Sequence, residues 1–384
     1  MNSGSHLDVA IVGAAQTKYE SAKSHLAYNE LVYEVVRELL ETTGVKMAQI
    51  HSQITASQDM YDGKTISSMS VNEVVGGYLK SECKVAADGL QALLYGVARV
   101  ASGAFDYTLV VAHCKESEGK PHPITGSMFD PFVERPLGLD AMLATSMQAE
   151  RYQTSRGITD DDLATISQRR HRQAARNSFS QRSGDYSVEQ IKNSPVLMGR
   201  IHELLAGPTS DGACALLLAR ANEAKRFATK AVWVAGLGNS TDAYWTDRDL
   251  TESKALQDAA GRAYRAAGID NPEKQINVAE VSARFAFEEP LYAEALALSK
   301  TKKIHEWIAS PDAGPSVNPS GGAITGNPAT VVGLTRAIEV YLQLSGQAGE
   351  HQVEHAGLGL AHGRDGICGQ NHSVVVMRSN SAVQ

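Results

Sequence analysis

The thiols of the chain, which could act as nucleophiles or metal ligands, are few and widely scattered. Its four cysteines lie far apart and form no CxxC pair: Cys83, Cys114, Cys214 and Cys368. This spacing excludes a zinc ribbon, and a disulfide scaffold is not expected in so long and cysteine-poor a chain. We therefore expect four reduced thiols, mostly buried, and no metal site.

Two further segments place polar groups where chemistry is favourable. In the turn Ala86-Ala87-Asp88-Gly89 the Asp88 carboxylate comes just before a helical pattern. It is interpreted as a helix cap, with a catalytic carboxylate as the alternative, because a negative charge is favourable at a helix N-terminus. His113 and Cys114 end an apolar strand and are either a packed pair or part of a site.

A basic stretch includes Arg169, Arg170, His171, Arg172 and Arg176. Guanidinium groups suit phosphate binding, but a solvated face or a subunit contact explains the stretch equally well. Glycine-rich phosphate loops of the dinucleotide or P-loop type are missing from the sequence, so neither NAD nor ATP is implied.

The elements that position these residues alternate between strand and helix. Residues 9–17 and 107–113 are apolar, β-branched runs, typical of buried strands. Residues 29–42 and 89–102 have apolar side chains at helical spacing. Such alternation predicts an α/β fold with a parallel sheet covered by helices.

The pattern then restarts after a long insertion, which indicates a duplicated architecture. Residues 210–219 and 232–241 read as strands, and residues 316–363 repeat the earlier order of turn, helix and a strand ending in Ala-His. The expected organisation has three parts: a first half (1–114 with 206–229), an inserted loop domain (115–205) and a second half (230–384).

Composition narrows the classes of function. The chain has 384 residues and a net charge of −7, from 36 basic and 43 acidic residues, which disfavours a nucleic-acid binder. It contains no run of 18 apolar residues, so no membrane span is expected. The first eight residues are polar and lack the apolar core of a signal peptide. We expect a cytoplasmic protein.

Four motifs, in order along nearly the whole chain, resemble those of the thiolase superfamily. They are residues 149–164 (AERYQTSRGITDDDLA), 210–219 (SDGACALLLA), 280–298 (EVSARFAFEEPLYAEALAL) and 316–328 (SVNPSGGAITGNP). The third is similar to the ELHDCF form of the branch that includes sterol carrier protein x, the SCP2 type. The resemblance implies two βαβαβαββ halves in a five-layered α/β/α/β/α sandwich with an inserted loop domain.

The resemblance also implies where the catalytic residues of a thiolase would be. Thiolases use a cysteine in a C-x-x-G turn to accept an acyl group from a CoA thioester, and this position is Ala86. The second cysteine and the histidine of the HDCF motif are replaced by Arg284 and Ser282, and the histidine of the G-H-P motif by Asn327. His362 falls where other thiolases have a C-x-G cysteine, but the SCP2 branch often has a histidine at this strand end, so His362 is either a functional residue or a structural one. The site is therefore expected to be degenerate.

The same resemblance implies acyl-CoA or CoA as the ligand, with no covalently bound cofactor. Loop-domain cations contact the CoA phosphates in the family, here Arg169, Arg170 and Arg172. Gly321 and Gly322 would allow close approach to the ligand. Arg284 either pairs with Asp88, Glu288 or Glu289, filling an inactive pocket, or reaches a ligand anion.

Three functions remain open at this level. The first is a thiolase-like subunit of an acyl-CoA C-acyltransferase complex that lacks its own nucleophile and supports a catalytic partner. The second is an enzyme of altered, non-covalent chemistry, such as a retro-aldol lyase acting on a CoA thioester. The third is a non-catalytic CoA-ester-binding scaffold. The resemblance implies a homo- or hetero-dimer of thiolase-fold chains and a possible zinc-ribbon/OB-fold partner of the DUF35 type.

Overall fold

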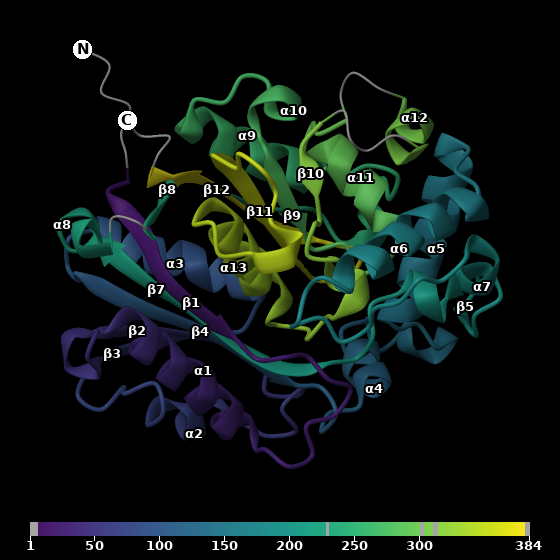
Figure 1. Cartoon of the computed structure of the whole chain (residues 1–384). Helices are drawn as coiled ribbons and strands as arrows, with labels where there is room; N and C mark the ends of the chain where they lie inside the picture. Colours follow the sequence, from purple (N-terminus) through teal and green to yellow (C-terminus); the bar gives the residue numbers. More distant parts are fainter. Residues whose placement is uncertain (1–6, 228–229, 300–302, 310–313, 381–384) are drawn as a thin grey trace.

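The computed structural model describes residues 7–227, 230–299, 303–309 and 314–380 (Figure 1). Residues 1–6 lie outside the described part. They make up most of residues 1–8, the segment that was expected to lack the apolar core of a signal peptide. Within the described residues, no helix combines the length and the apolar character needed to cross a bilayer.

One hydrogen-bonded sheet runs through the described part of the chain in the order β10-β9-β11-β12-β8-β1-β7-β4-β2-β3. The strands of its first half are β1 (Val9–Gln16), β2 (Ser52–Ala56), β3 (Ser81–Val85), β4 (Tyr107–Lys115) and β7 (Asp211–Arg220). Those of its second half are β8 (Val232–Thr241), β9 (Val278–Val281), β10 (Ser316–Val317), β11 (Leu358–Asp365) and β12 (Asn371–Ser379).

The two halves of the sheet repeat one pairing pattern. In the first half, β1 pairs antiparallel with β7 and β7 with β4, while β4, β2 and β3 run parallel. In the second half, β8, β12 and β11 pair antiparallel in the same way, and β11, β9 and β10 run parallel. The halves meet where β1 and β8 pair over two residues each. The expected duplication is therefore present in the fold.

Helices fill the space between the half-sheets and cover their outer faces (Figure 1). The middle layer consists of α3 and α13, which contact each other, whereas α1 packs outside the first half and α9 outside the second. This arrangement is the expected five-layered α/β sandwich. The helices of the two halves are α1 (Tyr28–Thr43), α2 (Ser68–Asn72), α3 (Gly89–Ala101), α8 (Ala221–Ala224), α9 (Lys254–Ala267), α10 (Pro272–Gln275), α11 (Glu288–Ala295), α12 (Ile304–Ala309) and α13 (Val332–Leu344).

The sequence of α13 explains its central place. All its residues except Leu342 are buried, including Arg336 and Glu339. A helix that is buried all round belongs inside a fold, whereas α1, buried only along one stripe, covers the sheet from outside.

The segment between the last two strands of the first half forms separate elements beside the sandwich. They are α4 (Pro121–Gly126), α5 (Ala141–Arg156), α6 (Asp160–Ala174), α7 (Val188–Lys192), β5 (Val196–Met198) and β6 (Ile201–His202). Thr159 caps α6, as its position before three aspartates predicts, and its hydroxyl accepts a hydrogen bond from the Asp162 N–H.

Candidate active site

An inner cavity of about 110 Å³ lies where segments from both halves meet. Two of the expected residues, Arg284 and Asn327, line it. Arg284 follows β9, and Asn327 lies between β10 and α13. The structure adds three polar residues that the sequence did not indicate: Tyr61, after β2, and Arg364 and Asp365, at the end of β11.

An outer cavity of about 380 Å³ adjoins the inner one. The two cavities share five lining residues: Thr125, Ala141, Arg284, Arg364 and Gly366. The walls of the outer cavity come largely from the insertion, through α4, the start of α5 and β5. A ligand entering through the outer cavity would therefore pass Arg284 and Arg364 before reaching Asn327 and Tyr61.

Burial tunes the acid groups around the inner cavity. It raises the pKa of Tyr61 to about 12, with the nearby Glu116 carboxylate adding to the shift. Burial also raises the pKa of Asp365 and of Glu116, although Arg284 opposes the shift of Glu116. Tyr61 is thus a neutral hydrogen-bond donor at neutral pH, and the two carboxyl groups hold protons more readily than exposed ones.

The two arginines of the cavity differ in their partners. Arg364 forms an ion pair of 3.1 Å with Glu288, and its Nε donates to the Ser282 carbonyl at 3.3 Å. The side chain of Arg284 forms no hydrogen bond or ion pair within the described residues, and its buried Nε has no partner. The expected pairing of Arg284 with an acidic side chain is therefore wrong: of its three candidate partners, only Glu288 contacts it, by accepting the Arg284 backbone N–H.

Asp88 lies beneath the site and lines neither cavity. Its carboxylate accepts hydrogen bonds from the backbone N–H of Leu90 (2.9 Å) and of Gly333 (3.0 Å), tying the start of α3 to α13. A Cβ at Gly333 or Gly363 would clash with this carboxylate, which accounts for both glycines. Burial raises the pKa of Asp88 to about 7.

No thiol occupies the nucleophile position. Ala86 is exposed directly after the edge strand β3, and Cys83 lies within that strand. Cys114 and Cys214 are buried in the core. Cys368 is also buried, as expected, but it lines the outer cavity. Burial raises the pKa of its thiol to about 12, so that it is a protonated thiol at neutral pH.

His362 and Ser282 are buried behind the cavity wall. His362 Nε2 lies 2.9 Å from Nδ1 of His372, whose Nε2 lies 3.0 Å from the Ser253 hydroxyl. Both imidazoles pack edge-on against Tyr292 of α11. Burial lowers the pKa of His362 well below its usual range, so the ring is neutral. Neither His362 nor Ser282 lines a described cavity.

The three arginines expected to contact CoA phosphates point in different directions. Arg170 is 1% exposed and forms a 2.7 Å ion pair with Glu289, so its assignment as a phosphate ligand is wrong. Arg169 donates to the Ile308 carbonyl, and Arg172 pairs with Asp185 at the surface. The stretch is not a common phosphate site: α6 turns one of its cations into the core and another toward solvent.

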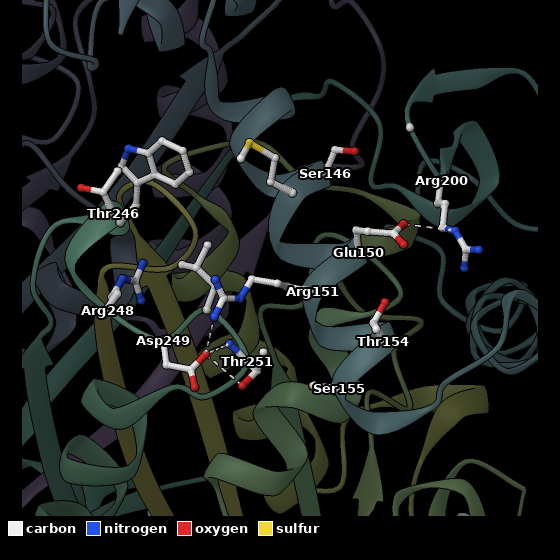
Figure 2. A pocket seen from close by; sticks show the side chains of 14 residues that line it. Ser146, Glu150, Arg151, Thr154, Ser155, Arg200, Thr246, Arg248, Asp249 and Thr251 are labelled. Atoms are coloured by element: carbon white, nitrogen blue, oxygen red, sulfur yellow. Dashed lines mark hydrogen bonds and ion pairs between the residues drawn. The ribbon is translucent and has the colours of Figure 1, made fainter. Parts of the chain in front are cut away.

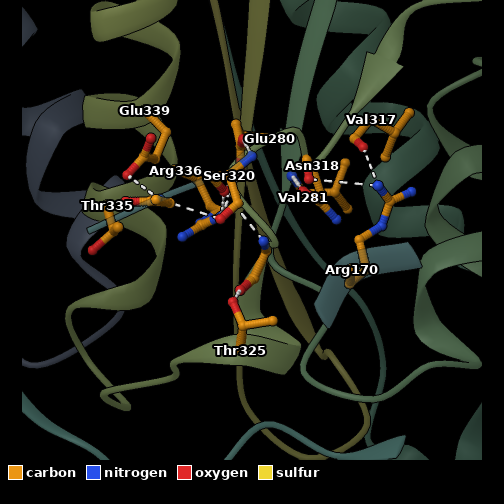
Figure 3. A network of polar contacts seen from close by, with 12 residues as sticks. Arg170, Glu280, Val281, Val317, Asn318, Ser320, Thr325, Thr335, Arg336 and Glu339 are labelled. Atoms are coloured by element: carbon orange, nitrogen blue, oxygen red, sulfur yellow. Dashed lines mark hydrogen bonds and ion pairs between the residues drawn. The ribbon is translucent and has the colours of Figure 1, made fainter. Parts of the chain in front are cut away.

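Gly321 and Gly322 belong to the buried segment that carries Asn327, and they line neither the inner nor the outer cavity. Both have positive φ, and a Cβ on Gly321 would meet Ala174 of α6. The polar network in Figure 3 fixes this segment: the Ser320 hydroxyl donates to Glu280 (2.8 Å), and Arg336 donates to the Ser320 hydroxyl (2.8 Å). These glycines shape the backbone beside the site.

A third and larger cavity is a groove of about 990 Å³ between α5 and residues 245–251 (Figure 2). Its apolar wall includes Met147, Trp245 and Leu250. Exposed guanidinium groups of Arg151 and Arg200 face Asp249 and Glu150. Surface pairs of this kind are weak, so both groups are able to receive a phosphate. No motif or pattern in the sequence indicated this groove.

The polar residues of the inner cavity are able to stabilise negative charge and to transfer protons. Asn327, Tyr61 and Arg364 provide donors for a developing negative charge on oxygen. Tyr61 and Asp365 are able to exchange a proton with a ligand. A thiolate nucleophile is missing from the inner cavity among the described residues.

Comparison with known families gives one match, to the thiolase C-terminal domain-like family over residues 236–378. Among curated relatives, an acetyl-CoA acetyltransferase of Methanothermobacter thermautotrophicus is 28% identical over 378 residues, covering 94% of this chain and 97% of the relative. Sterol carrier protein 2 of Oryctolagus cuniculus is 29% identical, covering 54% and 40%. The benzoylsuccinyl-CoA thiolase subunit BbsB of Thauera aromatica is 28% identical, covering 54% and 56%.

Solved structures share the fold over almost the whole chain. The Ltp2-ChsH2(DUF35) aldolase superposes with a TM-score of 0.81 at 19% identity, covering 98% of this chain and 99% of that one. A monomeric SCP2-thiolase like protein type 1 from Mycobacterium smegmatis gives a TM-score of 0.71 at 16% identity, covering 97% and 77%. Human mitochondrial 3-ketoacyl-CoA thiolase in complex with CoA gives 0.71 at 15% identity, covering 97% and 98%. Residues 236–378 therefore match the thiolase C-terminal domain-like family, and the whole chain has the fold of the thiolases and of an SCP2-thiolase like protein.

Proposed function

We propose that the chain binds an acyl-CoA ester and serves as a thiolase-like subunit of an acyl-CoA C-acyltransferase complex, without a nucleophile of its own. Its relatives include acetyl-CoA acetyltransferases and a thiolase subunit, which supports the class of substrate and reaction. The acyl end would enter the inner cavity through the outer one. The nucleotide end would lie in the groove along α5, which has the volume, the apolar wall and the exposed cations for it.

The observation that carries this proposal is an open cavity lined with hydrogen-bond donors in a chain that has no thiol at the nucleophile position. A helix N-terminus stabilises a thiolate, and α3 begins three residues after position 86, but Ala86 has only a methyl group to offer. The neighbouring donors remain in place around an open cavity. A covalent acyl transfer would therefore take place on a partner chain.

Two kinds of partner fit this role. One is a second thiolase-fold chain, the same or different, pairing along the sheet edge at β3. The other is a DUF35-type protein, as named for the aldolase whose fold superposes best among the structures above. Pairing with either kind of partner is part of this proposal. A cytoplasmic location of the chain is also part of it.

A second candidate function, a retro-aldol lyase, is favoured by the open inner cavity and by Arg284, which does not plug it. In that reaction a base removes the proton of a β-hydroxyl group and the Cα–Cβ bond breaks. Its electron pair passes to Cα, and the thioester oxygen carries the charge until Cα is protonated. The products are a carbonyl compound and a shortened acyl-CoA. Asp365 and Tyr61 would move protons, and Asn327 would hold the oxygen.

Intact mass spectrometry after incubation with acetyl-CoA and longer acyl-CoAs tests the proposal. We expect no acyl adduct on the wild-type chain and an adduct on the partner when both are present. The variant Ala86→Cys is the matched control, because it restores a thiol at the start of α3.

An adduct on the wild-type chain would overturn the proposal, and its loss in Cys368→Ser would identify the nucleophile. Adducts on neither chain, together with cleavage of a β-hydroxyacyl-CoA, would favour the lyase.

A further inference from the structure

We infer that Arg284 binds a second carboxylate, carried by the acyl group of the substrate, and that the substrate class is therefore the CoA thioester of a dicarboxylic acid. This inference rests on the proposed function, because it assumes that the acyl end of a CoA ester enters the cavities.

The first argument is that the guanidinium of Arg284 forms no ion pair of its own among the described residues. Glu288 pairs with Arg364 and Glu289 with Arg170, whereas Asp365, in the same cavity, interacts with Arg364. The positive charge of Arg284 favours the ionised form of Glu116, but the Glu116 carboxylate accepts its hydrogen bond from the Ser210 backbone N–H. A half-buried guanidinium with five donors and a buried, unpartnered Nε is costly unless an anion completes it.

The second argument is the position of this side chain. Arg284 lines both cavities, at their junction, so a ligand that spans them must pass beside it. Phe285 packs against its guanidinium, whose carbon lies 5.7 Å from the ring centre, and limits its freedom to turn away. A planar fork held in this way matches the two oxygens of a carboxylate.

The third argument concerns which anion would reach this point. The phosphates of CoA are separated from the thioester sulfur by the whole pantetheine arm. When the acyl end lies at the junction, the phosphates remain outside, and the exposed cations along α5 are available to them. A carboxylate on the acyl chain is then the anion nearest to Arg284. With about 110 Å³ in the inner cavity, the acyl group would be short.

Binding measurements with three CoA esters of similar length test this inference. They are glutaryl-CoA, its terminal carboxamide, and hexanoyl-CoA, titrated by calorimetry into the full-length wild-type chain, Arg284→Gln and Arg284→Lys. The surface variant Arg262→Gln, on α9, is the matched control for loss of one positive charge.

We expect the wild type to bind glutaryl-CoA at least tenfold more tightly than the two uncharged esters, about the contribution of one charge-assisted pair. Arg284→Gln should abolish that ratio and leave hexanoyl-CoA binding within about twofold of wild type. Arg284→Lys should keep part of the preference, and Arg262→Gln all of it.

Two results would overturn this inference without affecting the proposed function. The first is equal affinity of the wild type for all three esters. The second is equal weakening of all three esters in Arg284→Gln, which would mean that Arg284 binds the thioester oxygen. Absence of binding by every ester would instead overturn the proposed function, and the inference with it.

Discussion

At the scale of single residues, the site lacks what makes a thiol reactive. A nucleophilic cysteine needs an environment that lowers the pKa of its thiol, such as a helix N-terminus or a neighbouring cation. Burial instead raises the pKa of Cys114, Cys214 and Cys368. The start of α3 has the favourable electrostatics but carries Ala86, and its acidic neighbour Asp88 has become a structural cap.

Asp88 should make the stability of the fold depend on pH. Its pKa is about 7 in the folded chain and about 4 in an unfolded one, so the folded state retains a proton between these values. Stability contributed by this group is therefore lost as the pH rises from 4 to 7. Asp88→Asn mimics the protonated form. Relative to wild type, it should gain on the order of a few kcal/mol between pH 5 and pH 8.

Urea unfolding of both proteins at pH 5 and pH 8 measures this difference. Asparagine is unable to accept the Gly333 N–H through its amide nitrogen, but that penalty is the same at both pH values and cancels. Parallel pH dependence of the two proteins would show that Asp88 is ionised throughout this range.

At the scale of elements, a buried ion pair helps to attach α6 to the second half. Arg170 donates through Nε and Nη2 to Glu289 of α11, and its Nη1 donates to the Val317 carbonyl at 2.6 Å (Figure 3). Arg170→Met would leave the Glu289 carboxylate buried, with Asn318 as its one remaining hydrogen-bond partner among the residues that the structure describes. We expect a loss of about 3–5 kcal/mol in the free energy of unfolding.

Two variants serve as controls in the same denaturant titrations. Arg172→Met, two residues along α6, breaks only the exposed pair with Asp185 and should cost less than about 1 kcal/mol. The double variant Arg170→Met/Glu289→Leu should recover most of the loss, because it leaves no unpaired charge. A cost for Arg170→Met no larger than that for Arg172→Met would contradict the role of this pair.

Much of the fold could be predicted from the sequence because periodicity reports on elements. The repeated order of strand, turn and helix predicted the duplicated halves. The same signal could have corrected the interpretation of Arg170, which shares a helical face with Leu163, Ile166 and Ala174. Neighbouring arginines on a helix point in different directions around its axis. The positions of the apolar residues along the helix show which of these arginines lies on the buried face.

The site was harder to predict because four distant segments build it. Arg284 and Asn327 were found because they occupy motif positions. Tyr61 and Arg364 carry no motif, and they meet Arg284 only because β2, β9 and β11 end at one side of the sandwich. Cys368 was expected to be buried, and it is, but only the structure shows that the loop after β11 brings it to the wall of a cavity.

At the scale of the whole molecule, the ten-stranded sheet ends in an unusual edge. Strand β3 has one free side, and its first residues, Ser81 and Glu82, are exposed. Just before it, Tyr78 and Leu79 are 80% and 87% exposed. Proteins rarely leave an unpaired edge and large apolar side chains together in solvent. We propose that a second thiolase-fold chain covers this edge, and Ala86 beside it, in a dimer.

The dimer prediction has a direct measurement. Light scattering after size exclusion should give twice the chain mass for the wild type at micromolar concentration. Tyr78→Asp/Leu79→Asp should give the single-chain mass. Burying two carboxylates at an apolar interface costs far more free energy than leaving them in solvent on the single chain. Val196→Asp, on the exposed strand β5, is the matched control and should remain dimeric. A single-chain mass for the wild type, the state named for the Mycobacterium smegmatis neighbour, would contradict the prediction and leave Ala86 open to a different partner.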